Sequence, residues 1–68
     1  MTELRRLRIA TGMGVSDFAV HVGVKESTVR DWERGRCVPC ERNARRLARV
    51  LSDMLGRKVT WEEVRGGA

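Results

Sequence analysis

Apolar side chains recur at helical spacing through most of the chain, in five segments separated by glycine or proline. In the first segment, Leu4 and Leu7 are three residues apart and mark an inward face. Thr2 can cap a helix there, with Glu3 near the positive end of the helix dipole. Gly12 follows and is suited to end the helix.

Two short segments follow, and each is again closed by a glycine. Their apolar positions are Phe18, Ala19 and Val22 in a segment between Gly14 and Gly23, then Val29 and Trp32 in a segment from about 25 to 34 that ends before Gly35. Both spacings favour a short helix with one buried face.

Pro39 is expected to open a fourth helix, which has the clearest amphipathic stripe of the chain and ends at Gly56. The stripe consists of Ala44, Leu47, Ala48, Leu51 and Leu55. Thr60 and Glu63 then form a capping-box pattern for a short fifth helix, with Trp61 and Val64 inward. No segment alternates as a strand would, so the sequence predicts an all-α fold with five short helices.

The length of 68 residues allows one domain, placed at 1–65 and followed by a frayed tail at 66–68. No apolar run approaches the roughly 20 residues of a membrane span, and the first residues lack the apolar core of a signal peptide. The chain is therefore expected to be cytoplasmic. Lys and Arg number 14 against 9 Asp and Glu, and this net charge of +5 favours an anionic partner, either nucleic acid or an acidic membrane surface.

The second and third segments are joined by about four residues centred on Gly23. Two short helices with a tight glycine-containing turn form a helix-turn-helix unit, whose second helix presents a polar face to base edges. Glu33 in that helix is predicted to face inward, and a buried carboxylate needs a cation. Arg8, one position after Leu7, is the available one.

In the joint spacing of these positions, the chain resembles the Cro/C1-type (Xre-like) helix-turn-helix family over about residues 3–64. The matching positions are Leu4-x-x-Leu7-Arg8-x-x-x-Gly12-Met13, Phe18-Ala19-x-x-Val22-Gly23-Val24 and Ser27-Thr28-Val29-x-x-Trp32-Glu33-Arg34-Gly35, continued by Pro39, Leu47-Ala48 and Val50-Leu51. The resemblance implies a compact five-helix, lambda-repressor-like domain of a prokaryotic or phage transcriptional regulator that binds its operator as a homodimer.

The resemblance also implies roles for single residues. Arg8 and Glu33 would form the family's ion pair between helices. Positions 25, 26, 27 and 30 would face the major groove, and the residues predicted to read bases are Glu26, Ser27 and Arg30. Those near the DNA backbone would be Val15, Lys25, Thr28, Arg34, Arg36, Arg42 and Asn43.

The chain departs from the family pattern at three of these positions. Val15 stands where a glutamine helps to hold a phosphate, so it offers only its backbone N–H. Lys25 replaces a hydroxyl cap and can instead extend to a phosphate. Glu26 repels phosphate unless it accepts from a cytosine amino group or holds Arg30 through an i, i+4 pair.

Several other residues have an unremarkable interpretation. His21 and the run Arg45, Arg46 and Arg49 are expected to be solvated, and Val50 and Met54 to be core margin or dimer surface. Cys37 and Cys40 form one C-x-x-C pair without a second pair of ligands, so they are interpreted as reduced thiols, with redox or metal roles as the alternatives.

Together these features predict a small Cro-like repressor or autorepressor that binds a palindromic double-stranded operator in the cytoplasm, on the nucleoid. They predict no enzyme, cofactor, metal or membrane partner. The alternatives are an antitoxin with a protein toxin as partner, or an excisionase or MerR-like architectural protein, which would add a β-wing.

Overall fold

The computed structural model describes residues 2–66, and the regular structure within this range is entirely helical. The helices are α1 (Glu3–Thr11), α2 (Val15–Val22), α3 (Glu26–Glu33), α4 (Glu41–Leu55) and α5 (Trp61–Val64). The predicted all-α fold of five helices is therefore confirmed for the described residues. The predicted tail, 66–68, lies outside them except for Gly66, whose N–H donates to the Glu63 carbonyl (3.1 Å).

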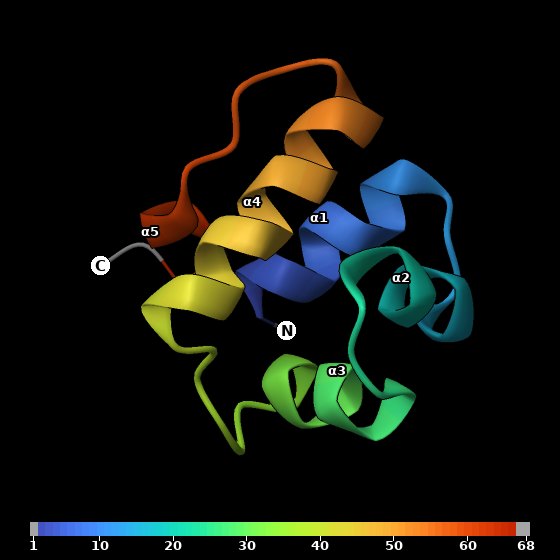
Figure 1. The fold of residues 1–68 in the computed structure, drawn as a ribbon, viewed down its shortest axis with the longest axis vertical. Helices are drawn as coiled ribbons and strands as arrows, with labels where there is room; N and C mark the ends of the chain where they lie inside the picture. Colours follow the sequence, from blue (N-terminus) through green and yellow to red (C-terminus); the bar gives the residue numbers. More distant parts are fainter. Residues whose placement is uncertain (1, 67–68) are drawn as a thin grey trace.

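The helices pack around one hydrophobic core. Figure 1 shows the longest helix, α4, crossing α1, with α5 beside α4 and with α2 and α3 packed against each other at the lower right. The innermost large side chains come from four helices and are at most 2% exposed: Leu4, Phe18, Val29, Leu47 and Leu51. No helix among the described residues is long and apolar enough to cross a membrane.

The predicted caps of α1 are confirmed. The Thr2 hydroxyl accepts from the Arg5 N–H (3.3 Å), and Gly12 adopts the left-handed conformation (φ 81°) that closes the helix. Gly23 and Gly56 close α2 and α4 in the same way. These positions require a positive φ, which glycine adopts without steric cost, and this is why the glycines mark the helix ends so reliably.

The predicted bounds of the next two helices need correction. The third helix is shorter than the predicted span of 25–34, because Lys25 and Arg34 are its flanking residues. The fourth helix begins at Glu41, two residues after Pro39. Cys40 has an extended backbone (ψ 166°) and is the N-cap, so the buried Pro39 precedes the helix instead of opening it.

The end of the chain also differs from the predicted arrangement. The Thr60 hydroxyl accepts from the Glu63 N–H (3.2 Å), but the Glu63 carboxylate pairs with Arg57 (3.3 Å) instead of completing the capping box. Trp61 packs against the core, as predicted, but is only half-buried, and the guanidinium groups of Arg45 and Arg65 lie over its ring, 5.3 and 5.8 Å from the ring centroid.

Candidate nucleic-acid interface

The helices α2 and α3 form a tight two-helix unit. The N–H groups of Gly23 and Val24 both donate to the Ala19 carbonyl, at 2.8 and 3.1 Å, which ends α2 and turns the chain sharply. Phe18 and Val29, both fully buried, anchor the two helices in the same core. This geometry fixes the direction of α3 relative to α2, as a helix-turn-helix unit requires.

The helix α3 is strongly amphipathic. Val29 and Trp32 are 0% and 6% exposed and face the core. Ser27, Arg30 and Arg34 are exposed on the opposite side. Of the other predicted contact residues in this segment, Lys25 is exposed, whereas Glu26 and Thr28 are half-buried. The outer face therefore combines short and long polar side chains, which suits close approach to base edges.

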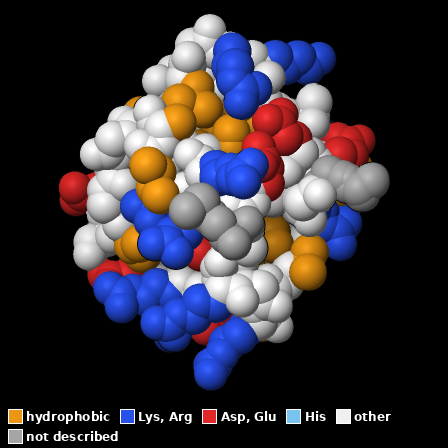
Figure 2. All heavy atoms as spheres, turned by 180° about the vertical axis from the view of Figure 1, so that it is seen from behind, with side chains coloured by type: hydrophobic (Ala, Val, Ile, Leu, Met, Phe, Trp, Pro, Cys, Tyr) orange, Lys and Arg blue, Asp and Glu red, His pale blue; other side chains and the backbone are white. Residues whose placement is uncertain are grey.

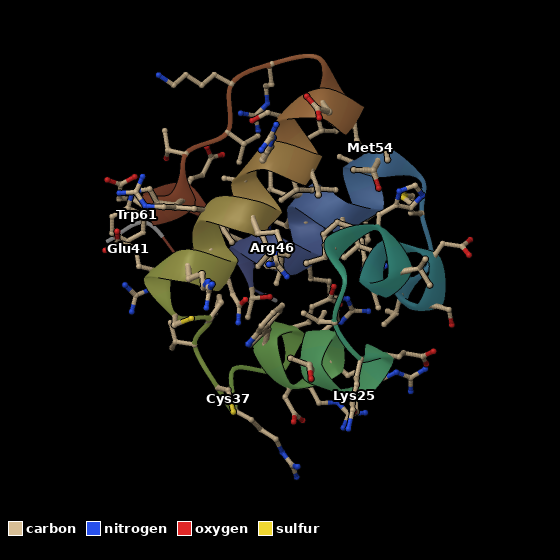
Figure 3. The ribbon with its side chains drawn as sticks, viewed as in Figure 1. Lys25, Cys37, Glu41, Arg46, Met54 and Trp61 are labelled. Atoms are coloured by element: carbon tan, nitrogen blue, oxygen red, sulfur yellow. The ribbon has the colours of Figure 1, made fainter. Side chains whose placement is uncertain are left out.

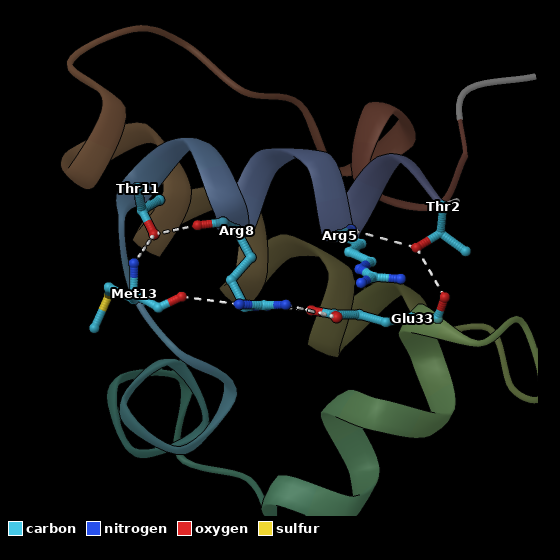
Figure 4. A network of polar contacts seen from close by, with 6 residues as sticks. All are labelled: Thr2, Arg5, Arg8, Thr11, Met13 and Glu33. Atoms are coloured by element: carbon cyan, nitrogen blue, oxygen red, sulfur yellow. Dashed lines mark hydrogen bonds and ion pairs between the residues drawn. The ribbon is translucent and has the colours of Figure 1, made fainter.

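An ion pair ties this helix to α1 (Figure 4). The Arg8 guanidinium donates from Nε and Nη2 to the two carboxylate oxygens of Glu33, at 2.6 and 3.1 Å. The two side chains are only 11% and 7% exposed. Arg8 Nη1 also donates to the Met13 carbonyl (2.9 Å), and the Thr2 hydroxyl donates to the Glu33 carbonyl (3.2 Å). The C-terminal end of α3 is thus held to both ends of α1.

A second polar link, between Ser16 and Glu26, joins the start of α2 to the start of α3. The Ser16 hydroxyl donates to Glu26 Oε1 (2.5 Å), and the Arg30 guanidinium pairs with Glu26 Oε2. Sequence reasoning gave the pair of Glu26 and Arg30 as one of two alternatives but missed Ser16, since one exposed serine carries no periodic signal. The carboxylate has a partner at each oxygen, so Glu26 holds Arg30 beside Ser27 on the outer face.

These contacts also change how Glu26 titrates. The Ser16 hydroxyl and the Arg30 guanidinium hold the pKa of the Glu26 carboxyl below its ordinary value. Because the folded-state pKa is the lower one, this contribution to stability is complete above the unfolded-state pKa and is lost as the pH falls through the folded pKa.

We therefore expect NMR titration of the Glu26 carboxyl to show a depressed pKa that Ser16→Ala moves upward. The neighbouring Ser27→Ala is the matched control and should leave the titration of Glu26 in place. An unchanged Glu26 titration in Ser16→Ala would mean that the serine does not bind the carboxylate in solution.

The predicted backbone contacts come from three other places. Val15 begins α2, Arg36 lies in the α3–α4 loop, and Arg42 and Asn43 lie in the first turn of α4. Seen from behind in Figure 2, Lys and Arg side chains gather at the lower end of the molecule, the end at which Figure 1 shows α3. Figure 3 shows Lys25 at this same end, at the start of α3.

The α4 arginines predicted to be solvated, Arg45, Arg46 and Arg49, are exposed, and two of them also contact neighbouring elements. Arg45 pairs with Glu41 (2.9 Å) as well as covering the Trp61 ring. Arg46 lies over the turn between α2 and α3, where its Nη1 would be 3.7 Å from a Cβ atom added to Gly23. Both side chains are therefore directed to neighbouring elements and not to the outer face of α3.

The residues whose role the sequence left open differ in their exposure. Val50 packs against the core, while Met54 is 42% exposed and His21 is exposed. Cys37 and Cys40 are exposed free thiols. Within residues 2–66, no group of three or more His, Cys, Asp or Glu side chains is arranged to hold a metal ion.

Changing Cys37 and Cys40 to serine together is expected to leave the melting temperature and the DNA affinity nearly unchanged. Both thiols are exposed, and Cys40 caps α4 without a side-chain hydrogen bond. A serine hydroxyl at position 40 can add that bond. The check is thermal melting and duplex binding of the double variant, with metal analysis of the purified wild type. Stoichiometric zinc would refute the interpretation of these residues as simple thiols.

Comparison with known protein families agrees with this geometry. The model of a family described as "Helix-turn-helix domain" matches residues 2–52, which extend from α1 through most of α4. The chain therefore belongs to this helix-turn-helix domain family, whose members typically bind DNA and are not enzymes. Neither the curated proteins nor the solved structures gave a match.

Proposed function

We propose that this protein is a sequence-specific double-stranded DNA-binding transcriptional regulator of the Cro/C1 type, a small repressor or autorepressor. The observation that carries the proposal is the exposed polar face of α3 on a rigid two-helix unit. Arg30 is the only exposed arginine in the middle of that face, and guanine O6 and N7 are the commonest specific target of a guanidinium group.

Different residues on and around this face are proposed to contact bases and phosphates. Ser27 is short and permits close approach of the helix to the bases. Lys25, Arg36 and Arg42 are exposed cations, and we assign them to contacts with phosphates. Contacts to phosphates fix the position of the protein on the duplex, whereas contacts to bases select the sequence. Thr28 and Asn43 are half-buried and would contribute only at the margin of the backbone contacts.

We further propose that the protein binds a palindromic operator as a symmetric homodimer. One short helix in one groove gives limited affinity, and two copies would read half-sites about 34 Å apart. The proposed interface lies around Leu55–Trp61, on the side of α4 and α5. A hollow of about 500 Å³ there is lined by Ala48, Val59 and Trp61 among charged residues, which supports contact with a second copy.

Selection of binding sites from random duplex DNA tests this function. We expect an inverted repeat with half-sites about one helical turn apart, bound by two chains per duplex in light-scattering measurements. Recovery of a single half-site bound by one chain at full affinity would overturn the dimer. Failure to enrich any sequence would overturn the proposal of specific binding.

A further inference from the structure

A small hollow opens between α1, the start of α2 and the outer side of α3. Its volume is about 230 Å³. The lining residues are dominated by arginine and come from all three helices: Arg5, Arg8, Val15, Arg30, Glu33 and Arg34. Arg5 belongs to α1, a helix to which the sequence assigned no DNA contact.

The charges around the hollow do not balance. Glu33 is neutralised by the bidentate pair with Arg8, and Arg30 is paired with Glu26. Among residues 2–66, neither Arg5 nor Arg34 takes part in an ion pair. Two guanidinium groups without a carboxylate therefore face one small space, so the hollow carries excess positive charge.

The fold gives both arginines their positions. Arg5 follows the buried Leu4 and lies three residues before Arg8, so Arg5 and Arg8 share one side of α1. Figure 4 shows the Arg5 side chain beside the pair of Arg8 and Glu33. Arg34 follows Glu33 directly and caps α3. The buried ion pair thus forms the floor of the hollow, with one free guanidinium supplied by each helix.

The donors suit a tetrahedral oxyanion. A guanidinium group has five N–H donors in a planar fork, which matches phosphate oxygens bidentately. Arg8 uses three of its donors for Glu33 and Met13, so two remain. Arg5 and Arg34 bring unused forks at the rim. The hollow therefore offers several converging donors and no uncompensated acceptor.

We propose that this hollow binds one backbone phosphate of the DNA, held mainly by Arg5 and Arg34, so that α1 takes part in DNA binding. The inference rests on the proposed function, since it needs a duplex lying along the outer face of α3. Arg30 lines the hollow and also belongs to that face, so a phosphate here lies next to the bases that α3 would read. Such a contact anchors α3 in the groove and carries no sequence information.

The first test compares two neighbouring arginines of α1. Arg6→Ala is the matched control, because Arg6 has the same charge but is 69% exposed and lies 4.0 Å from Glu3, away from the hollow. Binding to a selected duplex and to a scrambled duplex is measured at several salt concentrations. We expect Arg5→Ala to weaken both complexes alike and to reduce the slope of log K against log salt by about 0.9. Arg6→Ala should leave the slope unchanged.

A second test locates the phosphate. Single neutral methylphosphonate linkages are introduced along the selected duplex, and the affinity of each duplex is measured for the wild type and for Arg5→Ala. If the hollow holds one phosphate, one linkage per half-site weakens the wild type and weakens Arg5→Ala by a clearly smaller factor, because only Arg34 and the spare donors of Arg8 then remain. Additive losses at every linkage would overturn the proposal, as would equal slopes for Arg5→Ala and the wild type.

The outcomes separate this proposal from the proposed function. A wild type that binds no duplex at any salt concentration refutes the function itself. Intact binding without coupling between Arg5→Ala and any methylphosphonate linkage refutes only the assignment of a phosphate to the hollow. Inorganic phosphate serves as the remaining probe in NMR titrations. Saturable shifts at Arg5 and Arg34 with free phosphate, combined with no methylphosphonate coupling, would assign the hollow to a free anion and overturn its assignment to DNA.

Discussion

Replacing Arg8 with alanine is expected to lower the free energy of unfolding by about 3–5 kcal/mol. The substitution leaves the Glu33 carboxylate, 7% exposed, without its bidentate partner, and it also removes the bond to the Met13 carbonyl. The hydrophobic core of so short a chain is worth only about 3–5 kcal/mol in total. Arg8→Ala should therefore be largely unfolded at room temperature, as thermal melting followed by circular dichroism will report.

Two comparisons make this test specific to the ion pair. Arg6→Ala removes an exposed arginine of the same helix, 4.0 Å from Glu3, and should change stability by less than about 0.5 kcal/mol. Replacing both partners, as Arg8→Met with Glu33→Leu, should recover much of the loss, because no unpaired charge is then buried. A melting temperature for Arg8→Ala close to that of the wild type would mean that the pair is open to water in solution.

Replacing Arg30 with alanine is expected to cost about 1–3 kcal/mol on the selected DNA site and to relax the preference at one base pair per half-site. Arg36→Ala and Arg42→Ala should instead weaken selected and scrambled duplexes alike, because their proposed targets are phosphates. Equilibrium binding of all three variants to both duplexes distinguishes these outcomes. If Arg30→Ala lowered both affinities by the same factor, the assignment of Arg30 to the bases would be wrong.

The helices could be predicted from the sequence because their signals are local. Glycine at positions of positive φ, as at Gly12 and Gly23, marks the helix ends through steric constraints alone. Apolar spacing identified the buried faces of α1 to α4 because it is also a local signal. Pro39 was misplaced because proline fits both the first helical turn and the residue before a cap, and only the backbone of Cys40 separates these cases.

Side-chain contacts were predictable where burial demands a partner, or where helical spacing brings opposite charges together, as for Glu26 and Arg30. An inward Glu33 requires a cation, and Arg8 was the available one. Exposed side chains have no such requirement, since water satisfies them. Periodicity therefore gave no sign that Ser16 meets Glu26 or that Arg46 covers Gly23. Likewise, the spacing of α1 places Arg5 on the side of Arg8, but it gave no sign that a hollow lies on that side.

A scan with 7-deazaguanine tests the proposed reading of bases in duplex DNA by the outer face of α3. Each guanine of the selected site is replaced in turn, which removes the N7 acceptor and leaves Watson–Crick pairing in place. If Arg30 reads a guanine, one replacement per half-site weakens the wild type but has no further effect on Arg30→Ala. A wild type indifferent to every replacement, or an Arg30→Ala variant that remains as sensitive as the wild type, would contradict it.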